Sequence, residues 1–235
     1  MRRAILHLTR ADPVLASIIE RVGPYRIAYT EPDFETLVRS IVLQQLSGKA
    51  ARTIFARLKR AVAPRSRMTP EELLALSPET LRALGLSTQK ARYVRDLAEK
   101  VQAGAVDLAR ISHRPDAEVI EHLGQVTGIG EWTAQMFLLF ALRRPDVLAT
   151  GDLGIRTAIQ RAYRLRTLPP PGRVASVATR WHPHCSAACW YLWRSLESGA
   201  GAAPAATSRP ADGPPRRAAR SAGGSGRRRE TAGSR

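Results

Sequence analysis

Two glycines separated by one residue, Gly128 and Gly130, stand directly before an apolar helical segment that contains Trp132. Glycine can adopt a positive φ, and its missing side chain leaves the space above a turn open. The first backbone N–H groups of a helix have no partner inside the helix, so they are suited to binding a phosphate group. The same glycines also fit an ordinary turn between two helices, and at this point both interpretations stay open.

A carboxylate, Asp152, follows this turn and directly precedes another apolar helical segment. An aspartate in that position is most often an N-cap, because its side-chain oxygen accepts a hydrogen bond from a free backbone N–H. A carboxylate can also stabilise a cation that develops during a reaction, and it can orient or deprotonate a water molecule. Capping and catalysis are compatible in one residue.

The two cysteines, Cys185 and Cys189, are four residues apart, and His182 and His184 lie near them in the sequence. This spacing differs from that of the usual zinc knuckles, so we do not predict zinc there. Two cysteines are too few for a disulfide framework or for a cluster held by four cysteines. The sequence therefore predicts no iron–sulfur cluster.

The chain of 235 residues carries 37 lysines and arginines against 20 acidic residues, a formal net charge of +17. This excess favours a polyanionic partner, and nucleic acid before a membrane. No apolar run, Met136 to Leu142 included, exceeds seven residues, whereas a membrane-spanning helix needs about 18. No secretory signal follows Met1, so we expect a cytoplasmic, nucleoid-associated protein of the bacterial type.

The last 37 residues, 199–235, consist almost entirely of Gly, Ala, Pro, Ser, Thr and Arg. Such a segment cannot bury enough apolar surface to offset the entropy lost on folding, so we predict that it is disordered. Its eight arginines give it a net charge of +6, which leaves +11 on residues 1–198. It is either a solvated extension without a role or a non-specific tether to DNA.

Residues 1–198 are predicted to form short helices, because apolar residues recur at helical spacing and alternating runs of strand type are scarce. Several helix starts are marked in the sequence, among them Asp12-Pro13 and the capping box Thr69-Pro70-Glu71-Glu72. The predicted fold class is therefore all-α.

The segment from Leu123 to Ala134 resembles the hairpin of the helix-hairpin-helix DNA glycosylase superfamily, and it is most similar to the 3-methyladenine DNA glycosylase II family. That hairpin typically reads L-x-x-L-P-G-I-G-x-W-T-A, and Thr127 stands here where proline is usual. Asp152 stands where the family has its catalytic aspartate. Further similar segments extend the resemblance over residues 7–197: Gln44-Gln45-Leu46-Ser47-Gly48-Lys49, Gly85-Leu86-Ser87, Trp181-x-Pro183 and Trp190-Tyr191-Leu192-Trp193-Arg194.

The resemblance implies hydrolysis of the N-glycosidic bond of alkylated purines in duplex DNA, with the target nucleotide rotated out of the helix into a pocket. Three hairpin amides are then expected to bind a DNA phosphate: those of Gly128, Gly130 and Thr133. Three hairpin carbonyls are expected to hold a monovalent cation, Na⁺ or K⁺: those of Gly124, Val126 and Ile129. No other cofactor is expected.

The residue that fills the gap left by the flipped base is expected to be Gln45 or Leu46, at the turn between two helices. The alternatives are that Leu46 belongs to the core and that Gln45 caps a helix end; alignment with the family favours Gln45 in the gap. Lys49 is a further expected DNA contact.

The base pocket is expected to contain Trp132, Met136 and Trp190. Alkylated purines carry positive charge, and the electron-rich face of an aromatic ring attracts them. Trp181 is a further candidate, whereas we assign Trp193 to the core.

Asp152 is the expected catalytic residue, because a carboxylate stabilises the oxocarbenium-like sugar that the departing base leaves. In superfamily members that also cut the strand, a hairpin lysine attacks the sugar. Trp132 occupies that position here, so we expect a monofunctional enzyme that leaves an abasic site. The missing lysine and cysteines also disfavour an adenine or pyrimidine-lesion glycosylase. The alternative is that the protein is not an enzyme but a helix-hairpin-helix protein that binds damaged DNA without catalysis.

We expect one glycosylase domain over residues 1–198, a monomer with two lobes and double-stranded DNA in the cleft between them. One lobe would hold residues 37–145, including the hairpin at 123–134. Residues 1–36 and 146–198 would build the other lobe. Relatives tend to have Tyr-Arg where His184-Cys185 stand, which puts the C-terminal wall of the pocket in question.

Overall fold

The computed structural model describes residues 1–46, 48–63 and 66–197. All regular elements in these ranges are helical, which confirms the all-α prediction: α1 (Arg2–Ala11), α2 (Pro13–Val22), α3 (Phe34–Leu43), α4 (Gly48–Val62), α5 (Pro70–Leu74), α6 (Pro78–Ala83), α7 (Thr88–Gln102), η1 (Ile111–His113), α8 (Asp116–Gly124), α9 (Glu131–Phe140), α10 (Leu153–Ala162), α11 (Pro171–Ala178), η2 (Thr179–Trp181) and α12 (Cys185–Glu197). The segment predicted to be disordered, 199–235, lies outside the described residues. None of the described helices is long and apolar enough to cross a bilayer.

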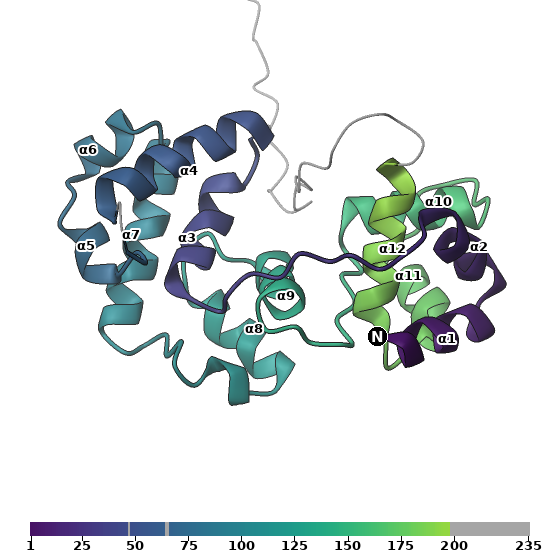
Figure 1. Ribbon diagram of the computed structural model, residues 1–235. Coiled ribbons are helices and arrows are strands. Elements are labelled where there is room, and N and C mark those ends of the chain that lie inside the picture. Colours follow the sequence, from purple (N-terminus) through teal and green to yellow (C-terminus); the bar gives the residue numbers. More distant parts are fainter. Residues whose placement is uncertain (47, 64–65, 198–235) are drawn as a thin grey trace, which may run out of the picture.

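The helices form two groups, as the two-lobed prediction requires (Figure 1). In one group α7 packs against α3, α5 and α6, and α8 packs against α9; in the other, α12 packs against α2 and α10. Two connections join the groups, the segment from α2 to α3 and the segment from α9 to α10 (Figure 1). The predicted lobe boundary between residues 36 and 37 falls inside α3.

Side-chain caps start several of these helices, as their sequences indicate. Asp33 Oδ1 accepts a hydrogen bond from the amide of Thr36, and the capping box of Thr69 and Glu72 is complete. Each cap satisfies backbone donors that the helix itself cannot satisfy. The caps therefore fix where the helices begin and hence how their apolar faces meet.

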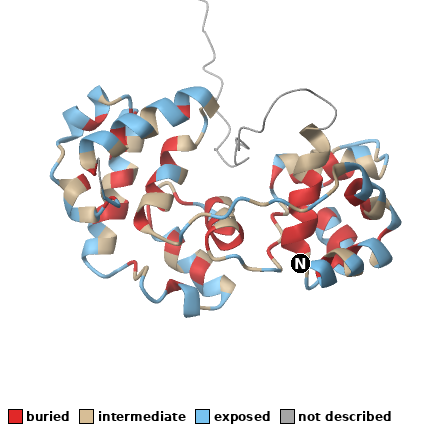
Figure 2. Ribbon diagram, in the orientation of Figure 1, coloured by how far each residue is buried: buried red, intermediate tan, exposed pale blue. Residues whose placement is uncertain are grey.

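The core of the C-terminal group surrounds α12, whose first eight residues are all buried (Figure 2). A buried carboxylate, Asp12, joins this core to the chain's N-terminal part: it accepts hydrogen bonds from Trp181 Nε1 and Tyr163 Oη while it caps α2. A buried charge is tolerated when its oxygens are satisfied in this way. These bonds tie the start of α2 to the end of α10 and to η2.

Candidate active site and nucleic-acid interface

The hairpin between α8 and α9 depends on one of its glycines more than on the other. Gly128 has φ +90°, and a Cβ atom there would lie 2.1 Å from Cδ2 of Tyr93. Gly130 has an ordinary φ of −94°, and a Cβ there would meet no atom within 4 Å. Gly128 is therefore required both for its backbone conformation and for the space it leaves to Tyr93.

The backbone amides at the start of α9 are free to bind an anion. Gly130 is the N-cap and provides no side-chain acceptor. The amides predicted to bind phosphate, those of Gly128, Gly130 and Thr133, have no acceptor among the residues that the structure describes. Free amides at a helix start present partial positive charge. This geometry suits the predicted phosphate clamp.

Two residues of α7 form hydrogen bonds with the hairpin backbone. Neither of them was predicted from the sequence. Asp96 Oδ2 accepts a hydrogen bond of 2.7 Å from the amide of Thr127. Lys100 Nζ donates to Asp96 and, at 2.8 Å, to the carbonyl of Gln125. Burial alone would raise the pKa of Asp96, but its hydrogen bonds with Lys100 and Thr127 hold that pKa below its usual value. The only sequence signal was an acid and a base four residues apart on one helix.

The hairpin carbonyls predicted to hold a monovalent cation retain acceptor capacity. The carbonyl of Val126 accepts one hydrogen bond, from the amide of Ile129. Those of Gly124 and Ile129 accept none from the described residues. A carbonyl oxygen has two lone pairs, so all three retain capacity for a cation ligand.

The turn after α3, residues 44–46, is fastened to the hairpin. Gln44 Nε2 donates to the carbonyl of Gly128 at 2.9 Å, and Lys90 Nζ donates to the carbonyls of Val42 and Gln44. Gln45 adopts φ +57°, a conformation that costs a non-glycine residue about 1 kcal/mol or more. These bonds hold the predicted gap-filling turn against the predicted phosphate clamp.

Gln45 and Lys49 are exposed, and Leu46 is partly exposed. Leu46 is therefore not a core residue, and Gln45, which follows the C-cap residue Gln44, has a side chain directed to solvent. Both remain candidates to fill the gap left by a flipped base.

Asp152 lies where α9, α10 and α12 meet, and three N–H groups of the described residues donate to its carboxylate. Oδ1 accepts from the amide of Ile155 at 2.8 Å and from Trp193 Nε1 at 2.9 Å. Oδ2 accepts from Trp132 Nε1 at 2.7 Å. The residue is only 3% exposed. Asp152 is thus both the cap of α10 and an acceptor-only carboxylate fixed in position by N–H donors.

Trp193 packs against the core, as expected, but its side chain is only partly buried and its indole N–H also donates to Asp152. Its ring stacks on Phe140 with the ring centroids 5.9 Å apart. Gly154 makes room for it: a Cβ there would lie 3.0 Å from Trp193 Cδ1 and 3.0 Å from Asp152 Oδ1. The glycine two residues after Asp152 is the sequence signal that could have indicated this close approach.

Comparison with known proteins identifies the family to which this site belongs. Residues 38–184 match the model of the HhH-GPD superfamily of base excision DNA repair proteins. The chain belongs to this superfamily. It is 34% identical over 200 residues to DNA-3-methyladenine glycosylase 1 of Schizosaccharomyces pombe, a match that covers 83% of this chain and 87% of that protein. The resemblance stated from the sequence is thereby confirmed.

Solved structures of other HhH-GPD proteins share the arrangement of helices. The 3-methyladenine DNA glycosylase of S. pombe, in complex with abasic DNA, matches with a TM-score of 0.74 and 34% identity, over 82% of this chain and 95% of that chain. The DNA-3-methyladenine glycosidase of Bacillus halodurans matches with a TM-score of 0.73 and 34% identity, over 84% of this chain and 89% of that chain.

The other residues predicted for the base pocket differ in burial and in what they contact. Met136 is partly buried on α9, one turn after Trp132, so both side chains lie on the same face of that helix. Trp190 is only 6% exposed, and its ring lies 4.6 Å from that of Tyr25. Trp181 is fully buried beside Asp12, which makes it a core residue. The pocket role of Trp190 stays a prediction.

Proposed function

We propose that the protein is a monofunctional DNA glycosylase that removes alkylated purines, such as 3-methyladenine, from duplex DNA. The observation that carries this proposal is the hydrogen bond from Trp132 to Asp152, because it joins the DNA-binding hairpin to a buried carboxylate. A protein that only binds DNA has no need of this link. The similarity to proteins named 3-methyladenine glycosylases supports the choice of substrate.

Binding would begin at the hairpin, where the free amides before and within the first turn of α9 hold a DNA phosphate. A monovalent cation on the carbonyls of Gly124, Val126 and Ile129 would add positive charge beside that phosphate. Gln45 or Leu46 would occupy the gap left by the flipped nucleotide. The base would then lie against Trp132 and Met136.

The chemistry follows from charge. An N3- or N7-alkylated purine is cationic, so it leaves as a neutral base when the electrons of the N-glycosidic bond pass to it, and no general acid is needed. The sugar becomes an oxocarbenium-like cation, which the fixed carboxylate of Asp152 stabilises. Water then adds to C1′ and loses a proton to Asp152 or to solvent. The products are the free base and an abasic site.

Strand cleavage through a Schiff base would need an amine at the sugar. Trp132 stands at the hairpin position where strand-cutting relatives have lysine. Two of the lysines have hydrogen-bond partners of their own, since Lys90 bonds the carbonyls of Val42 and Gln44 and Lys100 bonds Asp96. Borohydride treatment during the reaction is therefore expected to trap no covalent complex, and a trapped complex would overturn the monofunctional assignment.

The direct test is to incubate the full chain with duplex DNA treated with a methylating agent and to measure released bases by chromatography. We expect free 3-methyladenine and an alkali-labile site at each excised position. Tight binding to the same DNA without release of any base would instead establish a non-catalytic protein that recognises damaged DNA.

A further inference from the structure

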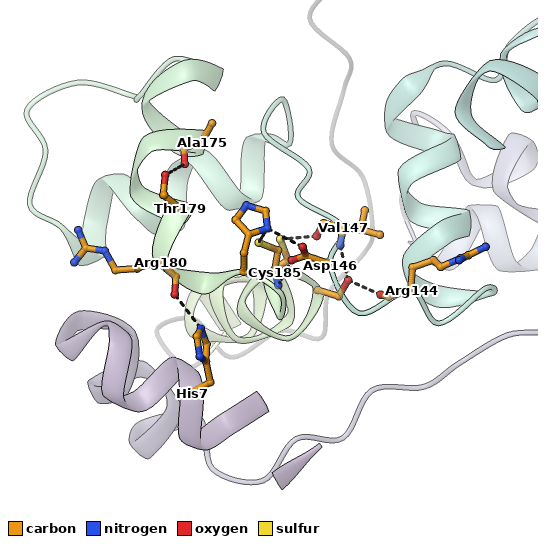
Figure 3. Close-up of polar contacts among 11 residues, drawn as sticks. His7, Arg144, Asp146, Val147, Ala175, Thr179, Arg180 and Cys185 are labelled. Atoms are coloured by element: carbon orange, nitrogen blue, oxygen red, sulfur yellow. Dashed lines mark hydrogen bonds and ion pairs between the residues drawn. The ribbon is translucent and has the colours of Figure 1, made fainter. Parts of the chain in front are cut away.

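Three side chains with metal-binding atoms meet at the start of α12, where the connection from α9 to α10 passes. Asp146 lies in that connection, His182 follows η2, and Cys185 is the first residue of α12. His182 Nδ1 lies 2.7 Å from Asp146 Oδ2 and 3.6 Å from Cys185 Sγ. All three ligand atoms lie within 4.8 Å of one another. Figure 3 shows Asp146 and Cys185 beside each other at this point.

We propose that Asp146, His182 and Cys185 bind a divalent transition-metal ion of the Zn²⁺ type. Carboxylate, imidazole and thiolate are all zinc ligands. The site revises the expectation that no zinc binds near the cysteines. The second cysteine takes no part, because Cys189 Sγ lies 3.7 Å from the carbonyl of Val147. The third ligand is instead Asp146, which is far from His182 in the sequence.

Two of the three distances between ligand atoms can be compared with those of a tetrahedral zinc ion. Zinc bonds of 2.0 to 2.3 Å in a tetrahedron place nitrogen and sulfur ligands about 3.6 Å apart and nitrogen and oxygen ligands about 3.3 Å apart. The Nδ1 to Sγ distance of 3.6 Å meets the first value. The Nδ1 to Oδ2 distance of 2.7 Å must widen by about 0.6 Å. Because the ring of His182 is exposed, a small rotation of that ring can provide this change.

Binding of the metal ion changes the protonation of two ligands. Cys185 gives up its thiol proton to solvent, and His182 binds through Nδ1 with its remaining proton on Nε2. One divalent ion neutralises the thiolate and the carboxylate together. Because His182 is exposed, a water molecule can complete the coordination.

Such an ion would act as a structural clip between α12 and the connection that leads from α9 to α10. The adjoining backbone is already fixed to α12, since Ser186 Oγ accepts from the amide of Val147 and donates to the carbonyl of Arg144. The same helix carries Trp193, which bonds Asp152. The ion would therefore stabilise the connection that leads to Asp152 without touching the reacting atoms.

The first test measures metal in the full chain, produced without an affinity tag in zinc-supplemented medium and purified without chelators. We expect about one zinc per chain by mass spectrometry, and a thiolate-to-metal charge-transfer band when Co²⁺ replaces it. Cys185→Ser should lose both signals. Cys189→Ser is the matched control, since it makes the same change on the same helix outside the cluster, and it should retain them. Absence of metal, or equal loss in the two variants, overturns the proposal.

The second test avoids variants that fail to fold, because His182 is exposed. Zinc ions should raise the thermal unfolding temperature of the wild-type chain but not that of His182→Ala, since only a ligand that binds the folded state stabilises it. An equal rise in both proteins would indicate adventitious surface binding and would overturn the site. Neither test depends on glycosylase activity.

Discussion

Asp152 receives three N–H donors, and two of them are indole groups from different helices, Trp132 on α9 and Trp193 on α12. Donors fixed in advance stabilise the ionised carboxylate without reorganisation when a sugar cation forms beside it. The sequence predicted Asp152 as an N-cap because capping is a local rule, and as the catalytic residue because of its place in the family pattern. The role of Trp193 could not be predicted, because it depends on how α12 packs against α10 at Gly154.

Replacing Trp193 by Phe removes one donor and preserves an aromatic ring. A hydrogen bond to a charged group is worth about 1.5–3 kcal/mol, so single-turnover base excision should slow by about tenfold or more. Trp181→Phe is the matched control, because it removes an indole donor from the buried Asp12. It should lower the unfolding temperature and leave the excision rate unchanged. Equal excision by Trp193→Phe and wild type would contradict the role of this donor.

At the scale of elements, the hairpin is held in place by residues from segments far away in the sequence. Its glycine pattern and the start of α9 could be predicted from local rules for turns and helix ends. Its supports could not, since Gln44 and Asp96 reach it from 84 and 31 residues away. Such contacts are set by tertiary packing, which the spacing of residues does not encode.

The two hairpin glycines should respond differently to the same substitution. Gly128→Ala places a methyl group on the ring of Tyr93 in a conformation with positive φ, so the hairpin must shift. We expect the affinity of the Gly128→Ala variant for DNA to fall by at least tenfold in a fluorescence anisotropy titration. Gly130→Ala meets no atom and should bind within a few-fold of wild type. Equal losses would show that hairpin geometry does not determine binding.

Asp96 should make the stability of the hairpin support depend on pH. Its pKa is lowered in the folded chain, so its ionised form contributes stability above its unfolded pKa of about 3.9. That contribution is lost as the pH falls through the lowered value. Urea unfolding should show Asp96→Asn less stable than wild type at pH 7 and a smaller difference near pH 3. A difference independent of pH would exclude this role of the charge.

At the scale of the molecule, two groups of helices carry complementary parts of the site. The hairpin and the turn at residues 44–46 belong to one group, while Asp152 and Trp193 belong to the other (Figure 1). The hydrogen bond from Trp132 to Asp152 joins the two groups. A basic chain of net charge +17 is suited to a DNA polyanion that contacts both.

A chain shortened to residues 1–198 should separate specific from non-specific binding. It keeps every residue of the proposed site and a net charge of +11, so excision should persist. Removal of eight arginines should make the plot of log affinity against log salt concentration shallower, because fewer counterions are released. An unchanged slope would identify residues 199–235 as an extension without a role in binding. Loss of excision would place part of the active site in them.

The central claim is that Asp152 performs the chemistry while the hairpin binds DNA, and Asp152→Asn tests it most directly. Asparagine offers one acceptor oxygen where the carboxylate offers two, so an unfolding curve must first confirm that the variant is folded. Base release from methylated duplex DNA and affinity for that DNA are then measured for both proteins. We predict release of 3-methyladenine by the wild type, with at least a hundredfold slower release and similar affinity for the variant. Release at the wild-type rate by Asp152→Asn would contradict the account.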